Sequence, residues 1–534
     1  MAQTVPSRRL RAPLPALHHP FQPRPPPTQR HPPGRAYVTR CFLLLVDGLR
    51  LDLADAELAA GALPNIAALV ARGGRACAVT AFPSTTSVAY LPFLTGCMPG
   101  RCDIPSIRWL DRARYRGRWW RDRAALRSYC GYQAALLDAD LAPDVRTIFE
   151  LVPESLALFT PVARGLTAER DPTRLARKLW GGVAHFARWH QPSDDAVGQH
   201  LVAAADGGAR FVFAQFPAVD GYSHQDGPAA PSVRRALGKV DEVVGRLVAR
   251  LAAREELERS LILLVSDHGA AAVHTHLDLA DWFRGRGIPT LAHPVVWTRA
   301  PRAAVMVAGN GSAMVYARPG EPRAGRWPLD RLRRGDAFGS GEDLVAALVR
   351  EPAVALVAAE EEYGAVRVAS WEGEAEVRRL GPGIAYRPLS GDPLGMGGPW
   401  LATERDWLEA TRDAEYPDAA YQLLDQFRSP RTGDLVVVSR AGYDFRRRWE
   451  IPEHRAGHGS LARAHMHTPV WSSEPLPAEL LRTVDLFPAI LSWLGVEPPP
   501  ALDGAAHWLP EAGKAAGSGA LRPGVPSPVG WAGA

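Results

Sequence analysis

Seven polar residues lie far apart in the sequence, and their side chains could together hold metal ions and carry a nucleophile. Each follows a short apolar run or sits in a short turn, and the set offers carboxylate, hydroxyl and imidazole ligands without a thiolate. Such ligands suit a pair of zinc ions or similar divalent metals. Two ions about 4 Å apart can hold the attacking and departing oxygens of a phosphoryl displacement. The seven are Asp47, Thr86, Asp220, His224, Asp267, His268 and His458.

Thr86 lies in the stretch FPSTTSVAYLPFLTG, residues 82–96, where Ser84, Thr85 and Thr86 place three hydroxyls in a Pro-bounded turn. A helix is expected to begin at Ser87 and to run to the end of this stretch. A hydroxyl at a helix start has backbone N–H groups and the positive end of the helix dipole beside it, which favours an anion next to a nucleophile. Ser and Thr are also common there as helix caps. The stretch alone therefore leaves both roles open.

Two Asp/His pairs follow predicted strands. Asp220 and His224 come just after the apolar run 210–217, and their spacing lets a carboxylate and an imidazole converge on one metal from a loop or a single helical turn. Asp267 and His268 follow the apolar run 260–265 and precede Gly269. Burying Asp and His side by side is costly unless a metal or an ion network satisfies them. Both pairs are candidate ligands.

The remaining two candidates have a structural alternative each. Asp47 ends the apolar run CFLLLVDG, residues 41–48, where an Asp is either a turn residue or a ligand. His458 stands between glycines in RAGHGSL, and glycine flanks let the backbone approach closely and adopt positive φ. That loop could present the imidazole, or His458 could be an ordinary exposed loop residue.

The elements that must position these side chains follow from the apolar pattern. The runs 41–48, 210–217 and 260–265 are typical of buried parallel strands, whose carboxyl ends carry functional groups. A helix at 63–72 followed by a strand at 75–79 predicts a βαβ unit with the first strand. The fold class expected is α/β, with a central mostly parallel sheet flanked by helices. Further helices are expected at residues 175–189, 195–205, 231–251 and 483–494.

A less regular region is expected to form an inserted α+β cap at residues 301–429, within a catalytic domain made of residues 39–300 and 430–500. Residues 303–317 predict a β-hairpin with Asn310-Gly311 as its turn, and short strands are expected at 353–358, 365–370 and 435–439. The Arg/Trp-rich segment 107–130 is either a solvated excursion or a lid that brings guanidinium groups to a phosphate-bearing substrate. Residues 1–38 are expected to form a disordered Pro/Arg-rich tail, and 505–534 a flexible one.

Composition excludes several classes of function. The 534-residue chain has a formal charge of +5, but seven arginines and no acidic residue lie within the first 40 residues, so the rest sums to −2. A nucleic-acid polymer is therefore not an expected partner. Five cysteines without a CxxC pair predict neither a disulfide framework nor a thiolate zinc site, and Cys41 is expected in the core. The chain contains no run of about 18 apolar residues, so no membrane span is expected. No secretory signal is recognised either, so a cytoplasmic location is expected.

The order of the motifs VDG, FPSTT…LTG, DGYSH, SDHG and GHGSL resembles the alkaline phosphatase superfamily, and within it the type I phosphodiesterase/nucleotide pyrophosphatase family. The resemblance covers about residues 41–110, 210–276 and 455–496. It implies Thr86 as the nucleophile and two divalent metal ions, zinc being the expected metal. One ion would lie among Asp47, Thr86, Asp267 and His268, and the other among Asp220, His224 and His458. The C/S-x-P-x-R motif of the sulfatases is absent, which disfavours sulfate ester hydrolysis.

The substrate contacts of that family do not match. Thr85 stands where the family usually has Lys, and Val88-Ala89 stand in place of a Pro-Asn pair. The Asn that often contacts the phosphate aligns near Ile107, so its neighbours Ser106 and Arg108 are candidate substrate-binding residues. His276, just past the Asp-His pair, is a third candidate, for which a surface histidine is the alternative.

The sequence thus predicts a metal-dependent phosphohydrolase that cleaves phosphodiester or pyrophosphate bonds of a small-molecule phosphate ester through a phosphothreonine intermediate. A phosphomonoesterase or a phosphotransferase of the same superfamily is the first alternative. A non-catalytic metal-binding homologue is the second, which the cost of idle buried carboxylates disfavours. The oligomeric state stays open.

Overall fold

The structure, a computed structural model, describes residues 39–117, 122–177, 187–321, 323, 325–446, 453–476 and 478–505. The described residues belong to one compact unit. Both predicted tails lie outside the described residues, apart from Ala505 at the start of the second. Most of the helix predicted at 175–189 lies outside them as well.

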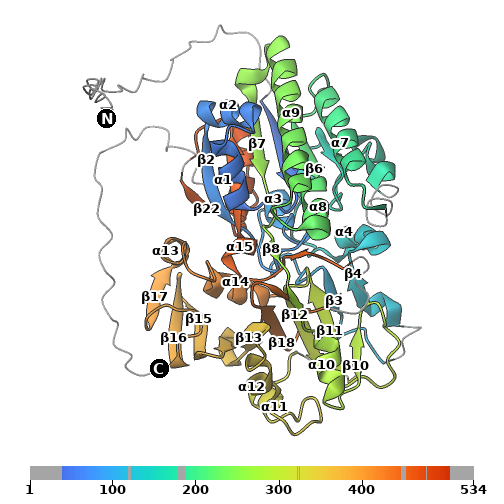
Figure 1. Ribbon diagram of the computed structural model, residues 1–534, viewed down its shortest axis with the longest axis vertical. Coiled ribbons are helices and arrows are strands. Elements are labelled where there is room, and N and C mark those ends of the chain that lie inside the picture. Colours follow the sequence, from blue (N-terminus) through green and yellow to red (C-terminus); the bar gives the residue numbers. More distant parts are fainter. Residues whose placement is uncertain are drawn as a thin grey trace, which may run out of the picture. The chain divides into compact units, whose positions relative to one another are not determined.

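A seven-stranded central sheet has the order β22-β2-β21-β7-β1-β6-β5 (Figure 1). Its middle strands β1 (Arg40–Val46), β6 (Phe211–Phe216) and β7 (Ser260–Val265) are parallel, and every residue in them is buried. Continuous apolar runs form such strands because both faces of the sheet are covered. The one strand that runs against its neighbours is β21, so the predicted mostly parallel sheet is confirmed. The outer strands are β2 (Gly74–Val79), β5 (Ser155–Leu158), β21 (His467–Ser472) and β22 (Leu480–Arg482).

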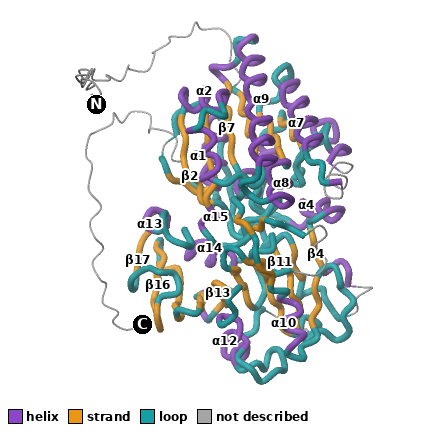
Figure 2. The backbone as a smooth tube through the Cα atoms, viewed as in Figure 1, coloured by secondary structure: helices purple, strands orange, loops and turns teal. Residues whose placement is uncertain are grey.

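Alternate residues of β1 belong to two different cores, one on each face of the sheet. Leu43 and Leu45 pack with α3 (Leu91–Thr95) and α16 (Leu486–Trp493), whereas Phe42 and Leu44 pack with helices on the opposite face. Cys41 is buried in the first core, as expected. Figure 2 shows α9 beside α7 on this second face. Helices that pack on the second face include α1 (Leu51–Ala59), α2 (Pro64–Arg72), α7 (Gln191–Ala204) and α9 (Pro231–Ala253).

The predicted βαβ unit needs a correction. Strands β1 and β2 run in the same direction with a helix between them in sequence, but they are not neighbours. Strands β7 and β21 lie between them. The strand–helix–strand order predicts correctly that β1 and β2 run in the same direction. It cannot predict that strands from later in the chain lie between them.

The helix predicted from Ser87 also begins later than expected. Ser87 has a φ of +74°, in the left-handed region that interrupts a helical path, and residues 86–90 form a turn. Helix α3 begins only at Leu91, with Pro92 in its first turn. Pro is tolerated there because the N–H groups of the first turn make no hydrogen bond within the helix. The expectation that Thr86 sits beside a helix start is therefore wrong, and Thr86 is a turn residue.

A second sheet has nine strands in the order β10-β11-β12-β18-β13-β14-β15-β16-β17. The predicted hairpin is confirmed: β11 (Ala303–Ala308) pairs antiparallel with β12 (Ser312–Ala317) across the turn that contains Asn310. The sheet also takes in residues outside the predicted insertion, in β10 and β18, and the domain boundaries stay a prediction. The other strands are β10 (Thr290–Ala292), β13 (Val354–Glu360), β14 (Val366–Ser370), β15 (Gly373–Leu380), β16 (Gly383–Gly391), β17 (Trp400–Thr403) and β18 (Leu435–Ser439).

Small elements connect the two sheets. The two-stranded pairs are β3 (Arg108–Leu110) with β4 (Leu126–Ser128), β8 (Ala271–Ala272) with β20 (Ala456–Gly457), and β9 (Thr275–His276) with β19 (Tyr443–Asp444). The remaining α-helices in the described parts of the chain are α4 (Leu137–Asp140), α5 (Ile148–Leu151), α8 (Ala218–Asp226), α10 (Leu279–Gly285), α11 (Leu329–Arg333), α12 (Leu344–Val349), α13 (Glu404–Ala410), α14 (Ala419–Gln426) and α15 (Arg463–Met466).

Among the described residues no single helix has the length and apolar character needed to cross a membrane. Helices α1 and α2 pass that test only as a pair, and they are bent by 97° at the break between them.

A buried acidic side chain at the end of α14 ties three segments together. The Asp425 carboxyl accepts the backbone N–H of Gly100 at 2.9 Å, and Arg428 lies 3.2 Å from Asp425 and 2.8 Å from Asp503. Burial and the neighbouring carboxylate of Asp503 raise the pKa of Asp425 to about 7. Since an unfolded Asp titrates near pH 4, the folded chain holds this proton more tightly than the unfolded chain.

We therefore expect Asp425 to make the protein less stable as pH rises. Between about pH 4 and pH 7 its contribution falls by up to roughly 1.4 kcal/mol per pH unit, because only the folded state keeps the proton. The Asp425→Asn variant cannot lose a proton there, so its stability relative to the wild type should increase from pH 5 to pH 8. Denaturant unfolding of both proteins at several pH values checks this, and a pH-independent difference would contradict it.

Candidate active site

Three neighbouring strands bring most of the predicted ligands to one edge of the central sheet. Asp47 follows β1, and Asp267 and His268 follow β7, while helix α8 begins two residues after β6. Because parallel strands end at the same edge, the residues that follow them converge. Helix α8 carries Asp220 and His224 four residues apart, so they lie on one face of a helix.

The first group of side chains surrounds Thr86. Its Oγ1 lies 3.3 Å from Asp47 Oδ1 and 3.2 Å from His268 Nε2. His268 Nε2 is also 3.4 Å from Asp47 Oδ1 and 3.3 Å from Asp267 Oδ2. The backbone N–H of Gly48 donates to Asp267 Oδ1 at 3.2 Å. Asp47, Asp267 and His268, separated by up to 221 positions in the sequence, therefore meet beside the Thr86 hydroxyl.

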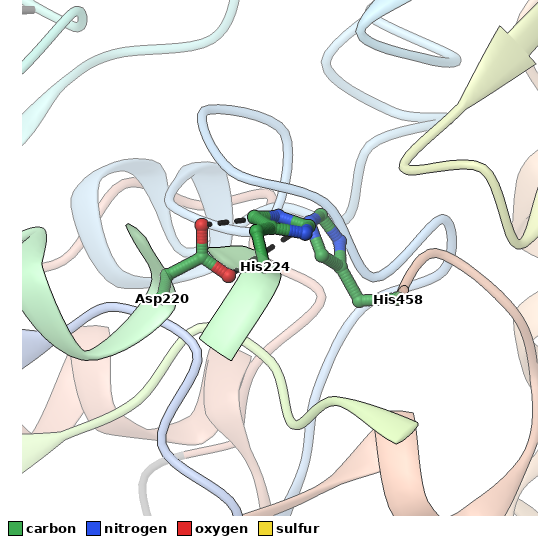
Figure 3. Close-up of side chains that lie close together, drawn as sticks. All are labelled: Asp220, His224 and His458. Carbon is green, nitrogen blue, oxygen red and sulfur yellow. Dashed lines mark ion pairs between the residues drawn. The ribbon is translucent and has the colours of Figure 1, made fainter. Parts of the chain in front are cut away.

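The second group is Asp220, His224 and His458 (Figure 3). His224 Nε2 lies 3.3 Å from Asp220 Oδ2, and His458 Nε2 lies 4.0 Å from Asp220 Oδ1. The imidazole rings of His224 and His458 have their centroids 5.1 Å apart. One ligand atom from each of the three residues lies within 4.8 Å of the others. This is an arrangement that a single metal ion can bridge.

The two groups are in direct contact. The rings of His268 and His458 stack with centroids 3.8 Å apart and planes at 11°. Asp47, Asp220 and His268 also offer ligand atoms within 4.8 Å of one another. Gly48 has a φ of +69°, and a Cβ there would lie 2.7 Å from Asp220 Oδ1, so a side chain at this position would collide with the site. The structure thus brings all seven predicted residues together, while their roles as ligands and nucleophile stay predictions.

The donor set fits divalent cations. Two buried carboxylate oxygens, Asp220 Oδ1 and Asp267 Oδ2, have no hydrogen-bond partner among the described residues. A buried carboxylate oxygen without a donor is costly, and a cation would satisfy both atoms. Carboxylate and imidazole ligands together are those that zinc accepts.

Backbone carbonyls fix the three imidazoles. Nδ1 of His224 lies 2.7 Å from the carbonyl oxygen of Ala456, Nδ1 of His458 lies 2.9 Å from that of Ser84, and Nδ1 of His268 lies 3.0 Å from that of Gly269. A carbonyl oxygen only accepts, so each Nδ1 carries the proton and each Nε2 presents its lone pair to the site. This is the orientation that a metal-binding histidine needs.

Burial sets the charge states of the site. It raises the pKa of Asp47, and the carboxylates of Asp267 and Asp220 raise it further. Burial also raises the pKa of Asp267, and the negative charge of Asp220 raises it further. For Asp220 burial acts in the same direction, but His224 and the other imidazoles outweigh it and hold the pKa below its ordinary value. Burial and His268 lower the pKa of His458, which favours the neutral, metal-binding form.

Sequence reasoning missed the residues that hold the candidate ligands in place. The Tyr90 hydroxyl and Gln215 Nε2 donate to Asp47 Oδ2 at 2.8 and 2.7 Å. Gln215 is a polar residue inside the apolar strand β6, a signal that could have identified it. Asp194 accepts the N–H of Ala218, the first residue of α8, at 3.0 Å. No feature of the local sequence points to Tyr90 or Asp194, because their partners are distant in the chain.

A cavity of about 270 Å³ opens beside the first group. The partly buried Thr86 lines it, so its hydroxyl is accessible to a small molecule. The other lining side chains include a cation and several aromatic or polar groups, among them Phe159, Arg188, His190, Gln215 and His454. The ring of His454 lies 4.1 Å from that of His224. The site therefore combines candidate ligands, an accessible hydroxyl and space for a substrate.

The three candidate substrate-binding residues lie outside the described lining of that cavity. Ser106 is fully buried, and its Oγ accepts the N–H of Arg108 at 3.3 Å. Arg108 lines a different cavity. His276 lies between Asp444 at 2.7 Å and Glu453 at 2.8 Å. Contact of these three residues with a substrate stays a prediction.

The Arg/Trp-rich segment 107–130 is partly buried, whereas Ala113, Arg114, Arg116 and Gly117 within it are exposed. Trp109 and Tyr115 are buried. Arg127 donates to both carboxylate oxygens of Asp140, and its guanidinium lies over the ring of Trp109 at 5.6 Å. The described parts are thus partly interior and partly solvated, so the solvated excursion and the lid both stay predictions, and residues 118–121 lie outside the described ones.

Comparison with known proteins places the chain in a family. The family model for type I phosphodiesterase / nucleotide pyrophosphatase matches residues 41–461. A crystal structure of phosphonoacetate hydrolase from Sinorhizobium meliloti 1021, in complex with phosphonoformate, is 15% identical with a TM-score of 0.51, over 85% of this chain and 96% of that one. Murine ectonucleotide pyrophosphatase / phosphodiesterase 5 is 13% identical with a TM-score of 0.51, over 87% and 97%.

The human form of the latter protein is 13% identical with a TM-score of 0.52, over 87% of this chain and 97% of that one. No curated protein sequence matches the chain. The family model covers most of the chain, and the solved structures share its fold, so the predicted family and fold class are both confirmed. The chain belongs to the type I phosphodiesterase/nucleotide pyrophosphatase family of the alkaline phosphatase superfamily and is a hydrolase of the phosphodiesterase or pyrophosphatase type.

Proposed function

We propose that the protein cleaves a phosphodiester or pyrophosphate bond of a small molecule through a phosphothreonine intermediate on Thr86, at a centre that holds two divalent ions, zinc in the first place. One observation carries the proposal. The Thr86 hydroxyl lies within 3.3 Å of both Asp47 and His268 and lines a cavity that a substrate can enter. A hydroxyl placed among candidate metal ligands, and open to solvent on one side, is positioned to act as a nucleophile.

The chain's own residues have defined tasks in this reaction. Asp47 Oδ1 accepts the hydrogen bond of the Thr86 hydroxyl and orients its oxygen, while Tyr90 and Gln215 hold the other oxygen of Asp47. Backbone carbonyls hold the imidazoles with Nε2 toward the site. The bound ions would supply Lewis acidity, which lowers the pKa of an oxygen nucleophile and neutralises charge on the phosphoryl group.

The bonds change in two steps. Thr86 Oγ1 forms a bond to phosphorus, and the bond from phosphorus to the leaving oxygen breaks. A water molecule then forms a bond to the same phosphorus, and the bond to Thr86 Oγ1 breaks. The products are an alcohol or phosphate from the first step and a phosphomonoester from the second. Thr86 regains its proton, so the enzyme returns to its starting state.

An inactive variant of a structurally similar protein supports the role of the threonine. An inactive variant of the murine ectonucleotide pyrophosphatase / phosphodiesterase 5, in which a threonine is replaced by alanine, has been solved in complex with AMP. Thr86 is the threonine that the motif order of this chain assigns to the nucleophile.

Replacement of Thr86 tests the nucleophile. We expect Thr86→Ala to lower kcat for bis(4-nitrophenyl) phosphate by at least about a thousandfold, because no oxygen remains to attack phosphorus. Thr86→Ser keeps an oxygen and should retain measurable turnover. Zinc content, measured by mass spectrometry, should stay close to wild type because the carboxylates and imidazoles remain. Full activity of zinc-loaded Thr86→Ala would exclude this mechanism, and a matched mono-aryl phosphate shows whether diesters are preferred.

Metal removal tests the proposed two-metal centre. Asp47 and Asp267 have a raised pKa because they are buried, so in metal-depleted protein their ionised forms destabilise the fold as pH rises. Two equivalents of Zn²⁺ should therefore raise Tm, and should raise it more at pH 8 than at pH 6. In Asp267→Asn the zinc-dependent increase should shrink, because a ligand and a buried charge are both removed. A wild-type Tm that does not respond to zinc, manganese or other divalent ions would refute the metal centre.

A further inference from the structure

His465 lies in the protein interior, at a position that links the turns of two candidate metal ligands. It belongs to the short helix α15, and only 3% of its surface is exposed. Its imidazole contacts the turn that follows His458, and its backbone carbonyl contacts the turn that follows His268. The proposed reaction does not use this histidine, so its burial beside the site needs a separate explanation.

The turn that follows His458 is held by side chains outside it. The backbone N–H of Gly459 donates to Ser84 Oγ at 3.1 Å. The next N–H, that of Ser460, donates to His465 Nδ1 at 3.2 Å. Gly459 has a φ of +95°, in the left-handed region, so the turn does not continue as a regular helix or strand. Two successive amides therefore take their acceptors from Ser84 and His465.

These contacts determine where the ring of His465 carries its proton. Because the Ser460 N–H donates to Nδ1, that atom is an acceptor and the proton is on Nε2. The Ser460 hydroxyl accepts the N–H of Ala462 at 3.1 Å and lies 2.8 Å from the same Nδ1. Nε2 of His465 is buried and has no hydrogen-bond partner among the described residues.

The unmet Nε2–H makes His465 a costly choice for packing alone. A buried N–H without an acceptor has lost its hydrogen bonds to water and gained none in return. A leucine, which is similar in size, would fill the same space without that cost. A leucine cannot accept the N–H of Ser460, however. The contribution of the ring is therefore the lone pair that Nδ1 presents to the turn.

The backbone of His465 holds the second turn. Helix α15 has only four residues, so its carbonyl oxygens have no partner within the helix. The carbonyl oxygen of His465 accepts the N–H of Gly269 at 2.8 Å. The carbonyl oxygen of Gly269 in turn lies 3.0 Å from Nδ1 of His268. One residue thus contacts the turns of both His268 and His458, whose rings stack with centroids 3.8 Å apart.

We propose that His465 is a positioning residue for the candidate metal centre, in which its Nδ1 holds the turn that places His458 in the second group of ligands. The inference rests on the metal centre of the proposed function and not on the phosphothreonine step. The side chain acts on the ion of the second group only. The contact with Gly269 is made by the backbone and remains after any replacement of the ring.

Zinc titration against a chromophoric chelator tests this role. In His465→Leu the dissociation constant of one of the two ions should increase by roughly tenfold or more, as is usual when a residue that orients a metal ligand is lost. The other dissociation constant should stay close to wild type. His465→Asn supplies an acceptor oxygen again and should recover most of the zinc affinity. A packing defect predicts the opposite order, because asparagine leaves the larger void.

Two further variants identify the ion that is affected. Asp267→Asn weakens the first group, so the tighter remaining ion lies in the second group, and adding His465→Leu should weaken its binding by about tenfold. His224→Ala weakens the second group, and adding His465→Leu should leave the tighter remaining ion unchanged. Equal losses of affinity in both backgrounds would reveal a general disturbance of the site and would overturn the proposal.

His467→Leu is the matched control. This second histidine, in β21, also has a buried Nε2, and the charges that act on its imidazole belong to Arg463, Asp413 and Arg412, which lie outside the candidate site. Its replacement should leave both zinc dissociation constants unchanged. The Tm of metal-free His465→Leu should be close to wild type, because one unmet donor replaces another. His465→Val removes the same acceptor and is the variant to titrate if leucine does not fit.

The outcomes separate this inference from the proposed function. Unchanged zinc affinity in folded His465→Leu, or no recovery in His465→Asn, would overturn the positioning role even in an enzyme that cleaves diesters through Thr86. A selective loss of zinc affinity in a protein that cleaves no diester would support the positioning role and refute only the proposed reaction. A wild type that binds no divalent ion would overturn both.

Discussion

Three hydrogen bonds between imidazole Nδ1 atoms and backbone carbonyls determine what the active site can do. They hold His224, His268 and His458 in one tautomer, with Nε2 toward the buried carboxylates. Without them each ring could rotate and present a proton instead of a lone pair. The carbonyls come from the loop after β2, the loop after β7 and strand β20, so the tautomers depend on how distant segments pack together and not on local sequence.

The same constraint explains where glycine is required. At Gly48 and Gly309 the backbone has positive φ and passes within van der Waals distance of a candidate ligand, Asp220 in one case and His458 in the other. The first glycine belongs to the central sheet and the second to the hairpin of the nine-stranded sheet. Segments attached to both sheets thus reach the site, and at these two positions a side chain would collide with a candidate ligand.

Much of this arrangement could be predicted because its signals are local. Apolar runs followed within a few residues by Asp or His marked the ends of β1, β6 and β7, and the candidate ligands that follow them meet as expected. Features that depend on distant partners could not be predicted. The left-handed backbone at Ser87 delays helix α3, and β21 separates strands that the sequence order made neighbours. The direction of the Arg108 side chain is likewise set by Val307, which lies 199 residues away.

The position of β21 in the central sheet has a consequence for synthesis of the chain. Strand β2 is made early, yet both of its partners, β21 and β22, lie within residues 467–482. During translation β2 therefore emerges from the ribosome with neither edge paired, and β7 has one open edge until the same late segment arrives. Exposed strand edges recruit other chains. The nascent protein must keep these edges apart from its neighbours until the last eighth of the polypeptide has been made.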